Sequence, residues 1–390
     1  MGGVTPRGYY MVGDPDTSHI TVQPGRAEAF TEARRALGLS RVLHSTYPVL
    51  DSAHKGAPHP VRDPFTGEVV AEVYHADIED ANAIIARNKE AQRVWASFTG
   101  NQRLAILEKV HERLIAKLDL LTTIGMRTVP KIRAEMAGEL VESRQAWEVY
   151  PREFAGSDSQ FRQIVMESLE ADRREAGYQK VLTYKPYGIF ASILPGNFRN
   201  AVFMWGFYMT LAPGNSVLAL PHEGAPLVEL AAGKIIADAL VEADPRLMWL
   251  VPTIIADPKV KQHIATYPDV NAIQATGATT MGVSIERALL NSPFPFRHFI
   301  REFSGNGALL LSRDFDVAEG TQIAVEAMFA TTGSRCTSGR RFLVPRESMP
   351  DVERHAAQIV RSLRIGDTFN PAVNVGPVLG GDRAVEIFRQ

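Results

Sequence analysis

Short apolar segments alternate with helical segments between residues 181 and 290, and few folds accommodate this pattern. Each apolar segment has the length of one buried strand, and each helical segment can carry the chain back to the other end of a sheet. We therefore predict an α/β fold built on a doubly wound, mostly parallel sheet. The expected strands are Val181–Tyr184, Gly188–Leu194, Ser216–Leu220, Trp249–Ile255 and Ala272–Ala275. The expected helices between them are Ala201–Leu211, Val228–Leu240, Pro258–Ala265 and Thr280–Leu290.

Residues 1–60 are expected to be irregular apart from one helix, whereas residues 77–154 are expected to be mainly helical. Asp77 is placed to cap a helix that runs to about Trp95, because acidic residues fill the first turn behind it. A second helix follows, in which the apolar residues between Leu104 and Leu121 form a single stripe. The remaining expected elements are the helices Ala27–Leu37 and Ile132–Phe154 and the strand Glu68–Tyr74.

A second α/β unit is expected to begin near Gly305. Only two strands are expected in it before the chain stops at Gln390, inside what is predicted to be another helix. Two strands are too few for an independent α/β layer, so we expect this unit to be incomplete and the chain to be C-terminally truncated. Its expected elements are Ala308–Leu311, Glu319–Ala330, Arg341–Val344 and Met349–Leu363.

The charge pattern argues against a nucleic-acid partner and against a membrane span. The 390 residues carry 42 basic and 44 acidic side chains, mixed along the chain, whereas proteins that bind nucleic acid gather Lys and Arg on one face. One stretch, between Arg199 and Glu223, carries no charge, but Pro213-Gly214-Asn215 interrupts it. Because such a trio breaks a helix, we expect a buried helix, a turn and a buried strand there.

Cys336 is the single cysteine, which excludes an internal disulfide and favours a cytoplasmic protein. It lies in a polar segment flanked by glycines, whereas structural cysteines usually have apolar neighbours. Arg335, Arg340 and Arg341 are close enough in the sequence to favour its thiolate. On these residues alone, Cys336 is either a reactive nucleophile or an inert loop thiol. The ten histidines are scattered singly, without a His-Glu-x-x-His pattern, so no metal site is expected.

Several motifs, in order between about residues 60 and 390, resemble those of the aldehyde dehydrogenase superfamily. The segment around Cys336 resembles the family's nucleophile motif, and the segment from Glu302 to Gly305 resembles its general-base motif. Glu302 lies 34 positions before Cys336, which matches the usual separation. The segment from Leu194 to Phe198 resembles the motif whose asparagine, here Asn197, completes an oxyanion hole. The other matching landmarks are Gly214-Asn215 with Pro221 and Glu223, Gly277 with Gly282, Gly366-Asp367, and Gly376-Pro377.

This resemblance implies NAD(P)-dependent oxidation of an aldehyde to a carboxylic acid. Cys336 would form a thiohemiacetal and then a thioester. The Asn197 amide and the Cys336 backbone N–H would hold the oxyanion, and Glu302 would activate the water that hydrolyses the thioester. The resemblance also implies a Rossmann-like NAD-binding domain over residues 1–303 and an incomplete catalytic domain over residues 304–390. A protruding strand at residues 177–187 would join a homodimer or homotetramer.

The predicted cofactor is NAD, and NADP is less favoured. The loop after Ala272–Ala275 and the helix through Gly282 would direct backbone N–H groups toward a pyrophosphate. Glu223, near the ribose, would repel a 2′-phosphate. Two residues depart from the family: Leu220 replaces a lysine that contacts the adenosine ribose region, and Ala278 replaces a loop serine, so dinucleotide binding should be weakened. The residues expected to bind the cofactor are Pro195, Pro221, Glu223, Gly277 and Gly282.

Two other functions are left open. One is a non-catalytic or truncated homologue, which the losses at Leu220 and Ala278 favour. The other is a CoA-acylating aldehyde dehydrogenase, in which CoA instead of water releases the thioester. Short likenesses after Gly305 and Cys336 suggest the antiquitin-like semialdehyde dehydrogenases, but they do not fix the substrate. The aromatic residues around Trp205 fit either a core or a wall of the substrate site.

Overall fold

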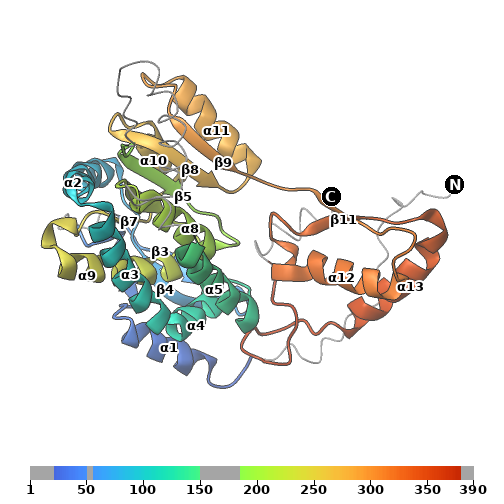
Figure 1. Ribbon diagram of the computed structural model, residues 1–390. Coiled ribbons are helices and arrows are strands. Elements are labelled where there is room, and N and C mark those ends of the chain that lie inside the picture. The colour runs from blue at the N-terminus through green and yellow to red at the C-terminus, as the bar shows by residue number, and fades with distance from the viewer. Residues whose placement is uncertain (1–21, 51–55, 150–184, 379–390) are drawn as a thin grey trace, which may run out of the picture.

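A six-stranded sheet forms the centre of the larger part of the molecule (Figure 1). In the computed structural model, which describes residues 22–50, 56–149 and 185–378, its strand order is β2-β7-β6-β5-β8-β9. All neighbouring strands are parallel except β2 and β7. The predicted α/β class with a mostly parallel sheet is therefore confirmed. The strands are β2 (Thr46–Tyr47), β5 (Ile189–Ile193), β6 (Ser216–Leu220), β7 (Thr253–Ile254), β8 (Val270–Thr276) and β9 (His298–Glu302).

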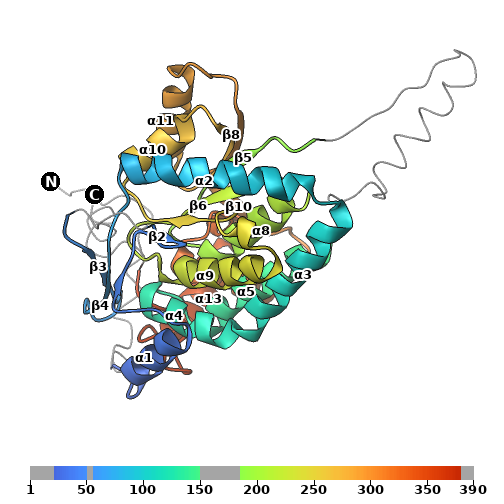
Figure 2. The same ribbon diagram turned by 90° about the vertical axis from the view of Figure 1, so that its left-hand side faces the viewer.

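Helices cover both faces of this sheet (Figure 2). One face is covered by α8 and α9, and α3, α4 and α5 pack outside these two helices. The other face packs against α2, α10 and α11. Because both faces are covered, β6 is apolar at nearly every position: Val217 and Ala219 face the first group of helices, and Leu218 and Leu220 face the second. The helices are α2 (Ile78–Ser97), α3 (Gly100–Ala116), α4 (Leu118–Thr128), α5 (Arg133–Val149), α8 (Arg199–Leu211), α9 (Leu227–Ala243), α10 (Pro258–Thr266) and α11 (Thr279–Leu290).

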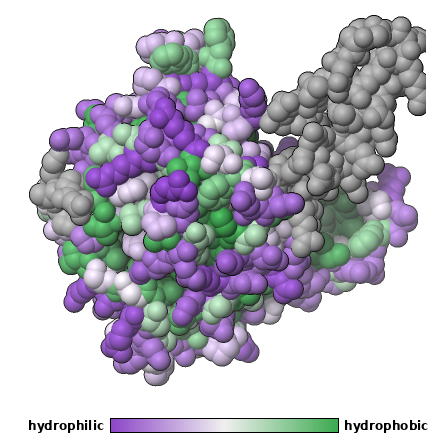
Figure 3. Space-filling view, turned by 60° about the vertical axis from the view of Figure 1, so that its left-hand side comes forward, coloured by the Kyte–Doolittle hydropathy of each residue, from purple (hydrophilic) through white to green (hydrophobic). Residues whose placement is uncertain are grey.

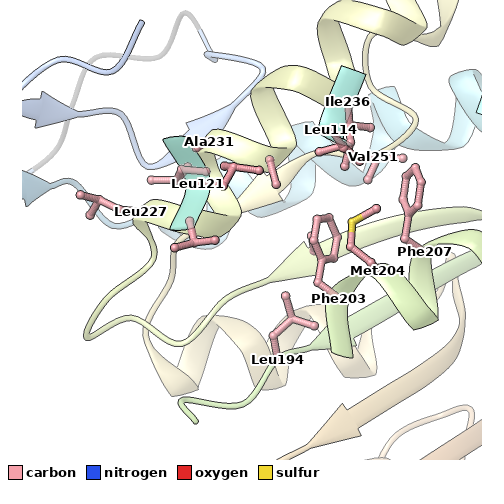
Figure 4. Close-up of a cluster of buried hydrophobic side chains, with 14 of the residues drawn as sticks. Leu114, Leu121, Leu194, Phe203, Met204, Phe207, Leu227, Ala231, Ile236 and Val251 are labelled. Carbon is pink, nitrogen blue, oxygen red and sulfur yellow. The ribbon is translucent and has the colours of Figure 1, made fainter. Parts of the chain in front are cut away.

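Most of the aromatic residues of α8 belong to the core; the sequence had left open whether they form core or a wall of the substrate site. Phe203, Phe207 and Tyr208 are fully buried in the core, and Figure 4 shows Phe203 and Phe207 within the same apolar cluster as residues of α3 and α9. Trp205 is only partly buried and packs against Phe198, with 5.7 Å between the ring centroids. Trp205 therefore lies beside the segment that carries Asn197.

Two smaller sheets complete the described structure. The first is the three-stranded sheet β1-β4-β3, which lies near α1. The second is a parallel pair, β10 and β11, which packs with α12 and α13 in a unit set apart from the large sheet in Figure 1. The elements are α1 (Arg26–Ala36), β1 (Val42–Leu43), β3 (His59–Arg62), β4 (Val69–Val73), β10 (Gly307–Leu310), α12 (Val317–Phe329), β11 (Gly339–Leu343) and α13 (Met349–Ser362).

One prediction for the helical region needs correction, and part of another is not tested. The apolar stripe from Leu104 to Leu121 belongs to two helices, because the backbone leaves the helical conformation at Lys117. The stripe continues across the break since both helices pack on the same core. The helix predicted to reach Phe154 is observed as far as Val149, and the rest lies outside the described residues.

Three predictions for strands also need comment. Of the predicted strand Trp249–Ile255, only Thr253–Ile254 is regular: Pro252 has no N–H for the ladder, and its carbonyl alone pairs with Ala219 at 2.9 Å. Strand β9 was not predicted, because it is an edge strand with one buried residue, Phe299. The predicted strand Val181–Tyr184 and the proposed oligomerisation strand up to residue 184 lie outside the described residues.

No helix within the described residues is long and apolar enough to cross a membrane. The uncharged stretch after Arg199 instead forms α8, a turn at residues 212–214 and β6, as expected. On the face of the molecule turned toward the viewer in Figure 3, hydrophobic residues lie in patches separated by hydrophilic ones.

Candidate active site

The strand order creates a switch point between β5 and β8. From β5 the chain continues through α8 to β6 and then to β7 on one side, whereas β8 returns to pair with the other side of β5. Connections that leave β5 and β8 therefore diverge at the carboxyl ends of these strands, and open α/β sheets bind ligands in the crevice formed there. Pro195 and Asn197 directly follow β5, and Gly277 directly follows β8.

Two candidate carboxylates lie on the same edge of the sheet. Glu223 follows β6, and Glu302 is the last residue of β9. Glu302 is exposed, and its carbonyl accepts a 3.0 Å hydrogen bond from the Gly277 N–H. The structure explains Gly282 by packing, since a Cβ there would lie 2.0 Å from the Phe303 ring.

Cys336 lies on the loop between α12 and β11, and its thiol is exposed. The segment that leaves Glu302 passes directly against it: a Cβ on Gly305 would lie 2.2 Å from the Cys336 carbonyl oxygen, so only glycine allows this approach. From the β5 side, the Asn197 side-chain amide donates a hydrogen bond to the Ser334 carbonyl. The loops that carry the three candidate catalytic residues thus meet at one place.

One of the two side-chain N–H groups of Asn197 is already used in a hydrogen bond. One N–H bond of its amide is occupied by the Ser334 carbonyl. A side-chain amide carries two N–H bonds, so one donor remains for an oxyanion on the Cys336 loop.

The backbone immediately before Cys336 is strained. Thr331 and Thr332 have φ values of 55° and 51°, and Gly333 follows at 68°. Branched residues rarely adopt left-handed backbone, and each costs on the order of 1–3 kcal/mol. Such a conformation persists only when its surroundings hold it in place. The Thr331 N–H donates a 2.5 Å hydrogen bond to Glu135, which anchors the loop to α5.

Helix α5 supports this loop with a row of acidic residues that the sequence analysis missed. Glu135, Glu139 and Glu142 are four and three positions apart and therefore lie on one face of the helix. Glu142 pairs with Arg335 at 3.1 Å. Burial raises the pKa of Glu135, and the hydrogen bond from Thr331 partly offsets this. The spacing of the three carboxylates was visible in the sequence and is the signal that could have identified them.

Glu139 links this row to the segment that carries Asn197. It is buried, forms an ion pair with the equally buried Lys131, and accepts a 2.9 Å hydrogen bond from the Asn200 N–H in the first turn of α8. Phe198, next to Asn197, contacts two cations: the Lys131 ammonium is 4.6 Å and the Arg335 guanidinium 4.2 Å from its ring centroid. These contacts fix the position of the Asn197 segment relative to the Cys336 loop.

The cofactor side of the edge contains both favourable and unfavourable features. Ala278, at the N-cap of α11, gives no side-chain hydrogen bond to the first turn, and residues 278–280 are exposed, which leaves backbone N–H groups available to a phosphate. Leu220 is fully buried and offers no polar group. A lysine that the sequence analysis did not consider, Lys261 of α10, instead donates to the Pro221 carbonyl and to Glu223.

Glu229, in the first turn of α9, is a fully buried carboxyl group. Among the described residues, no other group hydrogen-bonds either of its carboxyl oxygens. Burial raises its pKa from 4.5 to about 7, against the opposing attraction of Arg199. Glu229 is therefore mainly protonated in the folded protein at slightly acidic pH.

We predict that Glu229→Gln removes the decrease in the free energy of unfolding that the ionisation of Glu229 causes as the pH rises. Between pH 4.5 and about 7 the folded state binds more protons at this site than the unfolded state, so the free energy of unfolding falls as pH rises through this window, by roughly 3 kcal/mol at most. The variant should therefore be more stable than the wild type at pH 8 and nearly equal to it at pH 5. Urea unfolding at both pH values measures this.

The matched control for this prediction is Glu353→Gln, which changes an exposed glutamate of α13. Its effect on the free energy of unfolding should be small at both pH values. A Glu229→Gln effect of the same size at pH 5 and pH 8 would contradict the proposed titration of Glu229.

Comparisons with known proteins identify the family and the fold. A family model described as the aldehyde dehydrogenase family matches residues 51–388. An aldehyde dehydrogenase from Bartonella henselae superposes with a TM-score of 0.77 at 20% identity, over 89% of this chain and 70% of that protein. Aldehyde dehydrogenase C from Pseudomonas syringae, solved as a mutant with NAD+ and octanal, gives a TM-score of 0.73 at 21% identity, over 85% and 64%.

A third similar structure is described as an NADP-dependent enzyme from E. coli, with a TM-score of 0.72 at 19% identity, over 86% of this chain and 66% of that protein. At these identities the superpositions establish the fold alone. The chain spans about two thirds of the length of the solved proteins that it matches.

Proposed function

Because the chain belongs to the aldehyde dehydrogenase family, we propose that it oxidises an aldehyde to a carboxylic acid, with Cys336 as the nucleophile. The observation that carries the proposal is the contact between Gly305 and the Cys336 carbonyl, which joins the segment leaving Glu302 to the cysteine loop. Asn197 contacts the same loop through Ser334. These two contacts support a site in which a thiol, a carboxylate and an amide act together near the carboxyl edge of the parallel sheet, where ligands of such sheets bind.

In the proposed reaction, the Cys336 thiolate attacks the aldehyde carbon and forms a C–S bond, while the carbonyl π electrons move to the oxygen. The remaining N–H of the Asn197 amide and the Cys336 backbone N–H stabilise this oxyanion; losing one such donor typically costs about 3 kcal/mol. A nicotinamide cofactor, when bound, would supply the hydride acceptor. Loss of hydride from the adduct carbon would leave a thioester on Cys336. Glu302 then removes a proton from the water that attacks the thioester, and the acid and the thiolate are released.

For the cofactor we propose a nicotinamide dinucleotide at the switch point, with NAD preferred over NADP. The residues proposed to hold it are Pro195, Pro221, Glu223, Gly277 and Gly282. The free N–H groups at the start of α11 and the carboxylate after β6 fit a pyrophosphate and a ribose. Leu220 and Ala278 contribute no polar contact, so we expect modest affinity.

We retain the division into a Rossmann-like cofactor domain over residues 1–303 and a catalytic domain from residue 304 as a proposal. It is supported by the separation of the β10–β11 pair from the six-stranded sheet. A homodimer or homotetramer also stays a proposal.

The function is tested by measuring the reduction of NAD with a panel of aldehydes, with and without CoA, for the wild type and for Glu302→Gln. We expect the wild type to turn over without CoA. We expect the variant to release a burst of about one reduced cofactor per chain and then to turn over about 10²–10⁴-fold more slowly, because hydride transfer precedes the step that needs the base. Stopped-flow measurement of the reduced nicotinamide separates the two phases.

Glu326→Gln, an exposed substitution on α12, is the matched control and should leave both phases unchanged. Turnover only in the presence of CoA would instead support the CoA-acylating function. A complete lack of cofactor reduction in the wild type, burst included, would support the non-catalytic homologue and overturn the proposal.

A further inference from the structure

A buried lysine lies against the carboxylate that we propose to contact the adenosine ribose. The Lys261 ammonium donates 2.7 Å hydrogen bonds to the Pro221 carbonyl and to Glu223 Oε2. The Lys261 side chain is 10% exposed and that of Glu223 is 32% exposed. The carboxylate is therefore the partner that a ligand meets first, and the ammonium lies directly beside it.

This cation belongs to α10, whereas the resemblance would place a lysine in β6, at the position of Leu220. Leu220, the last residue of β6, is fully buried among the helices α2 and α10. Lys261 reaches the same end of β6 from α10, and it binds the carbonyl of Pro221, the residue that follows Leu220. A positive charge thus lies at this end of the strand although the strand itself provides none.

The pair changes how Glu223 interacts with an anion. Burial alone would raise the pKa of Glu223, but the attraction and hydrogen bond of Lys261 outweigh it and hold the pKa below its ordinary value. Glu223 is therefore ionised at neutral pH. An ionised carboxylate repels a 2′-phosphate, whereas an ammonium group within hydrogen-bonding distance of it opposes this repulsion.

The other nearby groups do not supply this charge. Burial, followed by the repulsion of Arg199, lowers the pKa of His222 to about 4, so the imidazole is neutral at pH 7. Arg199 is 3% exposed, and its guanidinium donates to the Gly196 and Ala225 carbonyls.

Two further groups face the same helix start. His75 hydrogen-bonds Asp257 at 2.7 Å, and the burial of His75 lowers its pKa, which favours the neutral ring. Asp257 precedes α10 and carries the opposite charge. Lys261 is the cation in contact with Glu223.

We propose that Lys261 is a specificity-determining residue that sets how strongly this chain discriminates between NAD and NADP. Its ammonium neutralises Glu223 and attracts a 2′-phosphate, so that NADP binds less than about tenfold more weakly than NAD. The inference rests on the proposed function, in which Glu223 lies beside the adenosine ribose.

The test compares two ligands that differ only at the 2′ position, ADP-ribose and its 2′-phosphate, by calorimetric titration of the whole chain. For the wild type we expect affinities within tenfold of each other. In Lys261→Met the 2′-phosphorylated ligand should bind at least about tenfold more weakly, whereas the affinity for ADP-ribose should change by less than about threefold. Lys261→Arg keeps the charge and should keep the wild-type ratio. Lys259→Met, on the exposed side of the same helix, is the matched control and should leave both affinities unchanged.

The ratio of the two affinities tests the role of Lys261, whereas the binding of either ligand to the wild type tests the cofactor site itself. Binding of both ligands with the same ratio in the wild type and in Lys261→Met would overturn the role of Lys261 and leave the cofactor site standing. An equal loss of both affinities would assign Lys261 a structural role and likewise overturn the inference. Failure of both ligands to bind the wild type would overturn the cofactor site itself, and the inference with it.

Discussion

Cys336→Ala is expected to abolish aldehyde oxidation and to leave the affinity for ADP-ribose within about twofold of the wild type. No second thiol can take over the attack, because Cys336 is the single cysteine of the chain. Removing the nucleophile of a covalent mechanism typically costs on the order of 10⁶-fold in turnover. The adenosine half of the cofactor is proposed to bind near Glu223, which follows β6, whereas Cys336 lies on the loop between α12 and β11, so the affinity should be retained.

The assay is the formation of reduced nicotinamide from an aldehyde, combined with calorimetric titration of ADP-ribose. Because the thiol is exposed, iodoacetamide should modify one group per chain in the wild type, with a parallel loss of activity, and none in the variant. Cys336→Ser, which keeps the size of the side chain, serves as the control for packing and should be nearly as inactive as Cys336→Ala. Turnover in Cys336→Ala close to that of the wild type would end the assignment of the nucleophile.

The presentation of this thiol depends on contacts that lie far apart in the sequence. The left-handed backbone at Thr331 and Thr332 is unfavourable by itself. It is held by Glu135 of α5 on one side and by Gly305 against Cys336 on the other. The loop is therefore shaped before any substrate binds, as electrostatic stabilisation of an oxyanion requires.

The elements with a strong local pattern could be predicted from the sequence. Strand β6 was predicted with its observed bounds, because a run of apolar residues between a turn and a proline leaves few alternatives. The helix that Asp77 caps was also predicted from a local signal, an N-cap residue followed by acidic residues. The structure shows the complete capping box. In both cases the information lies within a few neighbouring residues.

The features that the sequence analysis missed depend on tertiary contacts. Strand β9 has one buried residue, so its pairing with β8 leaves little trace in its own apolar pattern. Lys261 lies 38 positions from Glu223, and only the packing of α10 against β5 and β8 of the sheet brings the two charges together. The motif around Cys336 could be recognised, but the reason that its loop keeps its shape lies in the carboxylates of α5.

Lys131→Met is expected to lower the free energy of unfolding by about 3–5 kcal/mol, because it leaves a buried carboxylate without its cation. Lys131 and Glu139 are 0% and 1% exposed, and Glu139 also accepts hydrogen bonds from the N–H groups of Asn200 and Ala201. Urea unfolding at neutral pH measures the loss. The matched control is Arg133→Met, which breaks an exposed ion pair with Asp119 and should cost less than about 1 kcal/mol.

The double variant Lys131→Met, Glu139→Gln separates charge from packing. The neutral amide oxygen can still accept from the Asn200 N–H, and no buried charge remains, so we expect this variant to recover at least half of the lost stability. Because Glu139 binds the first turn of α8 and Asn197 lies just before that helix, the single variant should also lose oxyanion stabilisation, seen as a lower kcat under conditions where it is still folded. A cost for Lys131→Met no larger than that for Arg133→Met would contradict the stabilising role of the buried pair. An unchanged kcat would mean that the pair does not hold Asn197 against the cysteine loop.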